Sequence, residues 1–274
     1  MRFRSRVAAT AATLPLILGL AACGAEKTTF TATGDAGSTP APVSTPTPVA
    51  PPTTAPLKVA PAAGRLTTAT FLPAMKKAFA TNTTLRSSMR MVAGGQVMTV
   101  KAVQSATPLQ MKLEMNGASF GGKATMIVTG GKIYVSMKNV SPAGKFVAVD
   151  PDDSSDPLAA TFASMLDEMD PRKTFDAFDG GLISVEFVRS ETVGGVELDR
   201  YAVTMDTVKA LKAQGKGVVA GMPKTLVYSI WMDSDNLMRK VVFAMQGVKM
   251  TMTADDWGQP VSIKAPPARL IVKR

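Results

Sequence analysis

The sequence predicts an α+β fold: a curled antiparallel β-sheet, or half-barrel, of about ten strands with short helices on its concave side. Two long regions alternate apolar and polar residues with a period of two, and Gly, Asn and Pro turns separate the runs. Helical patterns lie before and between these regions. The alternation gives each strand one apolar face, which suits a sheet that is covered on one side only. A sheet of this size curls strongly, so helices on its concave side would cover the apolar face.

The ordered domain is expected to begin with an amphipathic helix. Phe71, Leu72, Met75 and Phe79 recur at helical spacing. Pro73 is expected in the first turn, where its missing N–H removes no hydrogen bond. We expect one face of this helix to pack on a single domain of residues 67–274, because no linker interrupts that range.

The first alternating region runs from residue 86 to residue 149. Met111, Leu113 and Met115 alternate with polar residues in its clearest strand, and Asn116-Gly117 then marks a hairpin turn. The strands expected in this region cover residues 86–93, 96–103, 109–115, 123–129, 132–137 and 145–149.

Two helices separate this region from the second one. Asp156 is a good N-cap, and Pro157 suits the first position of a helix that stops at Asp170-Pro171. A second short helix is expected to end at Gly180-Gly181, and another, capped by Asp206, lies further on. The remaining strands are expected at residues 182–189, 196–205, 226–232, 237–245 and 248–254.

The N-terminal residues have the parts of a secretory signal peptide. Three arginines within the first six residues precede a short apolar run, and small residues follow it. The stretch Leu20-Ala21-Ala22-Cys23 resembles the lipobox of bacterial lipoproteins, in which an acylated glycerol (for example with palmitate) is attached to the cysteine. We expect residues 1–22 to be removed and Cys23 to anchor the protein to the outer face of the cell membrane. The alternative is an ordinary signal peptide followed by an incidental cysteine.

Residues 23–66 are the expected tether between this anchor and the domain. They are rich in Thr, Pro and Ala, a composition that buries too little apolar surface to fold. Proline keeps such a chain extended at ~3 Å per residue, so some forty residues reach roughly 100 Å. A passive spacer is the preferred interpretation, and glycosylation of the threonines is the alternative.

The composition argues against several kinds of function. The chain contains no histidine, which removes the usual general base and the commonest metal ligand. Cys23 is the sole cysteine, so its lipidation would leave no thiol for a disulfide. We therefore expect no enzyme activity, cofactor or metal; a carboxylate-based hydrolase is the remaining enzymatic alternative. The net charge of +10 favours anionic headgroups, but the basic residues are scattered, so no nucleic-acid partner is expected.

Two local patterns have simple structural explanations. Residues 117–121 match the serine-hydrolase pattern G-x-S-x-G, but they lie between two strands and have no histidine partner. The aspartates between residues 152 and 156, and the pair Asp233 and Asp235, lack the spacing of a calcium-binding loop. A helix N-terminus explains the first acidic group, and a hairpin turn explains the second.

Methionine is unusually frequent, with 18 residues against 11 Phe and 3 Tyr. Its side chain is flexible and polarizable, which suits a surface that adapts to variable apolar partners. Two interpretations stay open: the methionines fill a core, or they line a cavity for acyl chains between the sheet and its helices. The candidate ligand-binding residues are Met111, Leu113, Met115, Phe162, Met165, Leu166, Met169 and Met205.

The layout resembles the actinobacterial LppX/LprG lipoproteins, which have a LolA-like half-barrel. The resemblance rests on the lipobox, the tether, the N-terminal helix, the long alternating regions and a C-terminal hairpin in which residues 228–233 run into residues 237–243. It covers about residues 67–257 and includes no single-residue motif.

This resemblance implies a half-barrel wrapped around helices, with an apolar cavity that binds an acylated lipid or glycolipid and takes part in its transport. The implied partners are that lipid and the membrane that Cys23 reaches. The alternative is an envelope interaction or regulatory lipoprotein with a packed core and no lipid cargo.

Overall fold

The two alternating regions of the sequence build a single sheet. A computed structural model describes residues 64–153, 155–168, 171–218 and 221–272. Within these residues, twelve strands form the sheet and four α-helices accompany it. The predicted signal peptide, Cys23 and nearly all of the predicted tether lie outside the described residues.

The helices are α1 (Thr68–Thr81), α2 (Pro157–Glu168), α3 (Pro171–Gly181) and α4 (Thr207–Ala213), with single 3-10 turns at Ala118–Phe120 and Ala268–Leu270. The strands are β1 (Thr84–Ala93), β2 (Gln96–Ala106), β3 (Leu109–Gly117), β4 (Gly122–Thr129), β5 (Lys132–Ser136), β6 (Phe146–Val149), β7 (Leu182–Val193), β8 (Val196–Asp206), β9 (Thr225–Met232), β10 (Met238–Met245), β11 (Val248–Asp255) and β12 (Ile271–Val272).

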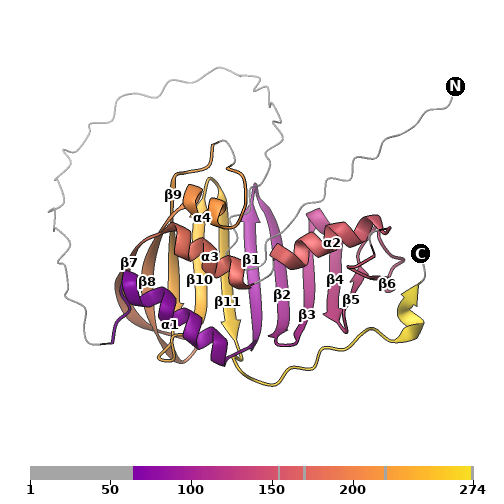
Figure 1. The fold of residues 1–274 in the computed structure, drawn as a ribbon, viewed down its shortest axis with the longest axis horizontal. Helices are drawn as coiled ribbons and strands as arrows, with labels where there is room; N and C mark the ends of the chain where they lie inside the picture. The colour runs from indigo at the N-terminus through magenta and orange to yellow at the C-terminus, as the bar shows by residue number, and fades with distance from the viewer. Residues whose placement is uncertain (1–63, 154, 169–170, 219–220, 273–274) are drawn as a thin grey trace, which may run out of the picture.

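The two regions meet at β1. The strand order is β12-β6-β5-β4-β3-β2-β1-β11-β10-β9-β8-β7, so β1 pairs with the last strand of the second region (Figure 1). Met89 of β1 faces Val100 of β2 on one side and Met252 of β11 on the other. Apolar residues therefore line up across the junction, and the two regions share one apolar face.

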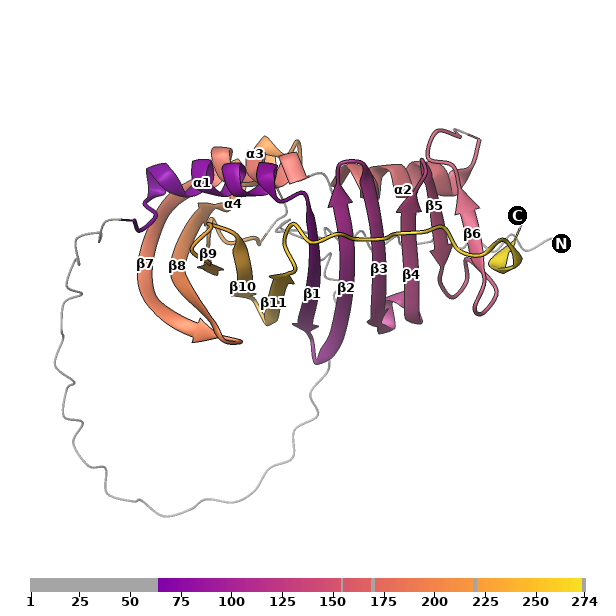
Figure 2. The same cartoon turned by 90° about the horizontal axis from the view of Figure 1, so that it is seen from below.

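The sheet is curled, and its helices lie on one side of it. Figure 2 shows β7 and β8 bending round at one edge, with α1, α2 and α3 along the same face of the sheet. The predicted α+β half-barrel is confirmed. The described residues form twelve strands rather than about ten; one of them is β12, which pairs parallel with β6 and has only two residues, too few for an alternating pattern.

Strand β7 is longer than its sequence pattern indicates. It continues to Val193, whereas alternation alone predicts an end near Arg189. The register shifts between Phe187 and Arg189, which marks a β-bulge. The extra residue interrupts the period of two, so the second half of the strand looks irregular in the sequence.

Helix α1 confirms the predicted N-terminal helix, with one correction. Thr70 Oγ1 accepts a hydrogen bond from the Thr67 N–H at 2.9 Å, and the helix begins at Thr68. Pro73 therefore lies in the second turn, not in the first as predicted. Phe71 is fully buried, and its ring centroid lies 6.1 Å from that of Tyr201 in β8, so this face of the helix packs on the sheet as expected.

The helices of the middle segment begin and end close to where the sequence predicts. Asp156 Oδ1 accepts a hydrogen bond from the Leu158 N–H at 2.9 Å, as an N-cap does. Helix α3 ends at Gly181, where a Cβ atom would lie 2.8 Å from the Asp206 carbonyl oxygen and 2.7 Å from Ala210 Cβ. This glycine therefore allows α3 and α4 to approach closely.

The two ends of the sheet are covered by different segments. Residues 256–270 run along one end, which we call the strap end (yellow, along the lower edge of the sheet in Figure 1). Thr84 Oγ1 donates to the Gln259 carbonyl at 2.8 Å, and Thr129 Oγ1 donates to the Ile263 carbonyl at 3.4 Å, so the segment crosses from β1 to β4. Helix α4 and the residues that follow it lie at the other end, the α4 end, together with the β1–β2, β3–β4 and β10–β11 turns.

Candidate functional site

The concave face of the sheet is the candidate site. Its inward side chains align from strand to strand as Met89, Val100 and Met115 in β1 to β3, and as Leu113, Met126, Val135 and Val147 in β3 to β6. These residues belong to one apolar cluster, which Phe71, Phe162, Phe178 and Leu211 extend from the four helices. Both alternating regions of the sequence therefore contribute side chains to this apolar face.

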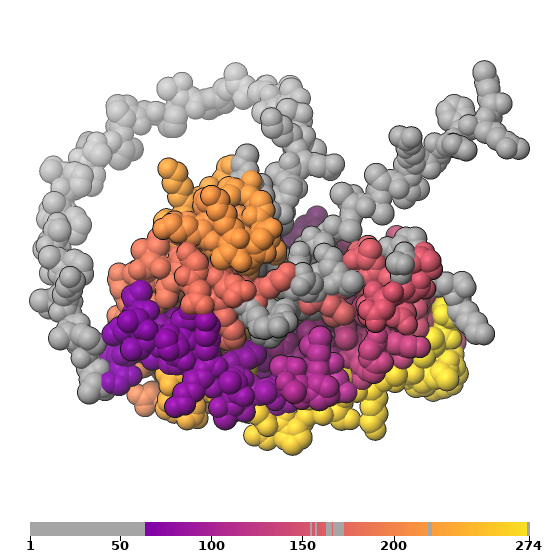
Figure 3. Space-filling view, in the orientation of Figure 1, coloured from indigo at the N-terminus to yellow at the C-terminus, as the bar shows by residue number. Residues whose placement is uncertain are grey.

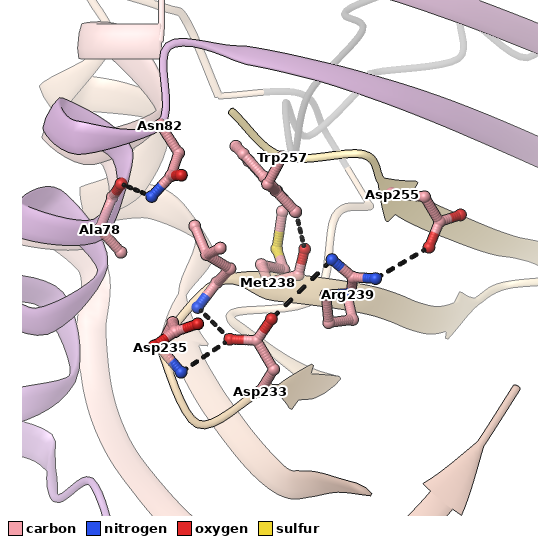
Figure 4. Close-up of polar contacts among 9 residues, drawn as sticks. Ala78, Asn82, Asp233, Asp235, Met238, Arg239, Asp255 and Trp257 are labelled. Carbon is pink, nitrogen blue, oxygen red and sulfur yellow. Dashed lines mark hydrogen bonds and ion pairs between the residues drawn. The ribbon is translucent and has the colours of Figure 1, made fainter. Parts of the chain in front are cut away.

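Packed side chains close this face at the strap end. Trp257 is buried, and its Nε1 donates a hydrogen bond to the Met238 carbonyl at 3.2 Å (Figure 4). Its ring lies edge-on to Phe79 of α1, with centroids 5.4 Å apart. Leu85 and Ala254 are buried in the same cluster. The beginning of the strap, through Trp257, thus joins α1 to the sheet.

The β9–β10 turn at the strap end is held together by polar contacts. Asp233 Oδ1 accepts hydrogen bonds from the Asp235 and Leu237 N–H groups at 3.0 and 2.9 Å. Arg239 lies between the carboxylates of Asp233 and Asp255, at 3.9 and 3.5 Å (Figure 4). The hairpin-turn explanation of this acidic pair is confirmed, because Asp233 Oδ1 holds the turn together and Asp235 lies within it.

Apolar side chains remain partly exposed at the α4 end. They pack against the same cluster but are not fully covered: Met91, Met115, Phe120, Met137, Val140, Met222, Phe243 and Met245. They come from the ends of β1, β3 and β10 and from the connections between strands. Partly exposed members of the cluster are therefore concentrated at the α4 end, whereas Trp257, Leu85 and Ala254 are buried at the strap end and Phe79 is partly exposed there.

Comparisons with known proteins show which solved structures this fold resembles. No family model matches the chain, and no curated protein matches it in sequence. The solved structure of LprF from Mycobacterium bovis matches with a TM-score of 0.51 and 15% identity, over 73% of this chain and 96% of that one. The fold is that of LprF. The lipoprotein LppX from Mycobacterium tuberculosis gives a TM-score of 0.48 and 13% identity, over 72% of this chain and 98% of that one.

A protein of the LolA superfamily is also among the solved structures that match. The LolA superfamily protein NE2245 from Nitrosomonas europaea is 10% identical, with a TM-score of 0.25 over 76% of this chain and 99% of that one. The match to LprF confirms, at the level of the fold, the resemblance expected from the sequence.

The LprF-like fold brings most of the predicted ligand-binding residues into one cluster. Met111, Leu113, Phe162 and Met205 are buried there, with exposed fractions of 2%, 0%, 8% and 3%. Met115 and Leu166 are partly exposed and pack against the cluster. Nothing is described of the Met165 side chain, and Met169 lies outside the described residues. Ligand binding by these residues stays a prediction.

Apart from Met115, the partly exposed apolar residues of the α4 end are not among the residues predicted from the sequence. Phe120, Met137 and Met222 lie in connections between strands, where alternation gives no signal. A different signal was present, because connections usually carry polar side chains and these carry large apolar ones. Large apolar residues in the connections between strands therefore mark the end at which the apolar face reaches solvent.

The polar groups near the face suit structure rather than chemistry. Ser119, the central residue of the G-x-S-x-G match, is exposed in the turn between β3 and β4, as the turn explanation predicts. Burial raises the pKa of the Tyr228 and Tyr201 hydroxyls, so both stay neutral at physiological pH. Among the described residues, no group of acidic side chains could hold a metal ion, and no helix is long and apolar enough to cross a membrane.

Proposed function

We propose that this protein is a membrane-anchored envelope lipoprotein that binds an acylated lipid or glycolipid on its concave face and takes part in its transport. The main support is the apolar face itself, whose side chains are mostly buried at the strap end and more often partly exposed at the α4 end. The predicted lipidation of Cys23 supplies the anchor on the outer face of the cell membrane.

The energetics favour acyl chains as ligands of such a face. Each methylene that leaves water contributes about 0.8 kcal/mol, so one long chain binds tightly with few polar contacts. Methionine side chains adapt to chains of different length and curvature. Met91 and Met115 lie at the partly exposed end, where the chains would enter.

Mass spectrometry of co-purified lipid tests the proposal. The chain from residue 23 onward, carrying Cys23→Ser so that it has no anchor, would be expressed in a bacterium. The purified protein would then be washed to remove loosely bound lipid. We expect an acylated lipid to co-purify in a stoichiometric amount with the protein. In the Met91→Asp/Met115→Asp variant we expect at least about tenfold less lipid, because the charges must then be desolvated beside the chain.

A matched variant controls for general damage to the sheet. Val103→Asp/Val242→Asp introduces the same charges at partly exposed positions whose neighbours Ala102 and Val241 belong to the apolar cluster, so they face the other side. We expect normal loading in this variant. Absence of lipid from the unmodified chain, or equal loss in both variants, would contradict binding on the concave face.

The packed-core interaction module remains the second candidate, because one observation favours it. Met111, Leu113 and Met205 are almost fully buried without any ligand, as they would be in a filled core. Uptake of a hydrophobic dye separates the two: a filled core takes up none, whereas an emptied lipid-binding face takes up dye that added lipid displaces.

A further inference from the structure

Charged side chains are divided between the two ends of the sheet. Exposed or partly exposed lysines gather at the α4 end, in the turns and in the strand residues beside them: Lys123, Lys138, Lys212, Lys216, Lys224 and Lys249. Asp206 lies at the same end, where its side chain accepts a hydrogen bond from the Lys209 N–H at 2.9 Å as the N-cap of α4. The α4 end is therefore strongly basic.

The strap end has the opposite charge. Its turns carry the acidic residues Asp150, Glu197, Asp233, Asp235, Asp255 and Asp256. Arg86 Nε lies 3.1 Å from Asp256, and Arg239 lies between Asp233 and Asp255. Lys132 and Lys264 also lie at this end, so these six acidic residues are opposed by four basic ones and the strap end is weakly negative. The molecule thus carries a charge dipole along its strands, with the positive pole at the α4 end.

Exposed aliphatic side chains accompany the lysines. Val97 at the β1–β2 turn is 44% exposed, Val218 in the loop after α4 is 49% exposed, and Ile183 at the start of β7 is 49% exposed. Figure 3 shows α4 and the segment around it (orange) as a projection at the top of the molecule. Apolar tips among lysines are the combination that binds the interface of an anionic bilayer.

We propose that the α4 end docks on the surface of an anionic phospholipid membrane, with its lysines at the headgroups and its aliphatic tips at the interface. Each lysine near such a surface contributes about 1 kcal/mol, and the acidic strap end is repelled, so the two charges together set the orientation. Docking would bring the partly exposed apolar end of the concave face against the lipids. The use of docking in lipid transfer rests on the proposed function, whereas the docking itself does not.

The expected tether does not select this orientation. The residues between Cys23 and Arg65 would reach roughly 100 Å at ~3 Å per residue. An eleven-residue strand such as β2 is only about 36 Å long. Either end of the sheet could therefore reach the membrane, and the charges decide which end does.

Vesicle flotation tests the docking directly. The chain from residue 23 onward with Cys23→Ser would be mixed with vesicles of phosphatidylglycerol and phosphatidylcholine, or of phosphatidylcholine alone. We expect binding to the anionic vesicles only, weakened by salt because exposed charges are screened. The Lys123→Glu/Lys224→Glu/Lys249→Glu variant should bind at least about 100-fold more weakly, because losing three lysines at about 1 kcal/mol each accounts for that factor and the new carboxylates add repulsion.

A charge-matched variant is the control. Lys77→Glu/Lys132→Glu/Lys264→Glu changes the net charge equally but at exposed positions in α1, at the β4–β5 turn of the strap end and in the strap. This variant should bind nearly as well as the parent chain. Equal weakening of both variants, equal binding to neutral vesicles, or no binding to anionic vesicles would each overturn the proposal.

Lipid analysis of the same samples separates the two proposals. A chain that docks but carries no acylated lipid would contradict the proposed function and leave the docking surface intact. A chain that carries lipid but ignores anionic vesicles would contradict the docking alone. If the lysine end instead captures an acidic protein while failing to bind vesicles, the surface has a different partner and the membrane proposal is wrong.

Discussion

Gly181 is the residue whose replacement has the clearest structural consequence. Its missing side chain lets the end of α3 approach the Asp206 carbonyl and Ala210. We expect Gly181→Ala to lower the free energy of unfolding by about 1–3 kcal/mol, because the added methyl overlaps the backbone of the β8–α4 junction. Urea denaturation followed by circular dichroism measures the change.

Gly217→Ala is the matched control for this substitution. No atom lies within 4 Å of the position that a Cβ at Gly217 would occupy. We expect this variant to unfold within about 0.5 kcal/mol of the parent chain, as surface substitutions usually do. If Gly181→Ala proves equally harmless, α3 and α4 do not approach as closely as described.

The contacts of Glu191 lead us to predict that the stability of the protein depends on pH. Trp231 Nε1 donates a hydrogen bond to its carboxylate, Arg189 lies 2.7 Å away, and these contacts hold the pKa of Glu191 below its ordinary value of 4.5. A depressed folded-state pKa stabilises the protein above the unfolded-state pKa, and that contribution is lost as the pH falls through the folded-state value.

The corresponding experiment compares acid titrations of stability. We expect the parent chain to lose unfolding free energy as the pH drops below about 4.5, and Glu191→Gln to lose less over the same interval, because the amide does not titrate. Thermal unfolding between pH 7 and pH 3 provides the measurement. Parallel curves for the two proteins would mean that Glu191 makes no such contribution.

The strap is an element whose anchoring can be tested by itself. Ile263 is buried and its carbonyl accepts the hydrogen bond from Thr129, whereas the neighbouring Ser262 is exposed. We expect Ile263→Asp to destabilise the protein by at least about 2 kcal/mol, since a carboxylate would have to be buried or the strap released. Ser262→Asp should have little effect.

Limited proteolysis identifies which of these happens. A released strap would be cleaved between residues 256 and 270 while the rest of the domain survives. If Ile263→Asp melts and is digested like the parent chain, the strap does not depend on this side chain.

Helix α2 offers a test of the proposed ligand face at the same scale. Leu166 is partly exposed and packs on the apolar cluster, whereas Ala160 on the same helix is exposed. We expect Leu166→Asp to lower lipid loading at least about tenfold while the protein stays folded, because a charge would face the acyl chain. Ala160→Asp is the control, and equal lipid content by mass spectrometry in both variants would remove α2 from the proposed face.

At the scale of the whole molecule, the proposed lipid anchor at Cys23 would decide where the domain resides. The lipobox predicts that Cys23 carries the acyl chains, and each buried methylene contributes about 0.8 kcal/mol to membrane binding. We expect Cys23→Ser to move the full-length protein out of the detergent phase of a Triton X-114 partition, or to leave it uncleaved at its signal peptide. A variant that is processed and still enters the detergent phase would show that Cys23 is not the anchor.

Prediction from sequence succeeded where a periodic pattern had an independent boundary. Asp156 and Asp206 marked helix starts that the structure confirms through their capping hydrogen bonds. The alternation of Met111, Leu113 and Met115 placed the apolar face of β3 correctly, since Met111 and Leu113 are buried. It could not predict the bulge in β7 or the pairing of β12, because a bulge breaks the period and two residues have none.

The sequence by itself determined the two alternating regions, most helix boundaries, the α+β class and the expected anchor at Cys23, because these depend on neighbouring residues. Only the tertiary structure decided that β1 pairs with β11, that residues 256–270 close one end, and that the lysines and acidic residues lie at opposite ends. Positions such as Lys123 and Lys249, or Asp150 and Asp255, are far apart in the chain. They come together because strand order and register place their turns at the same end of the sheet, and local periodicity contains no information about that order.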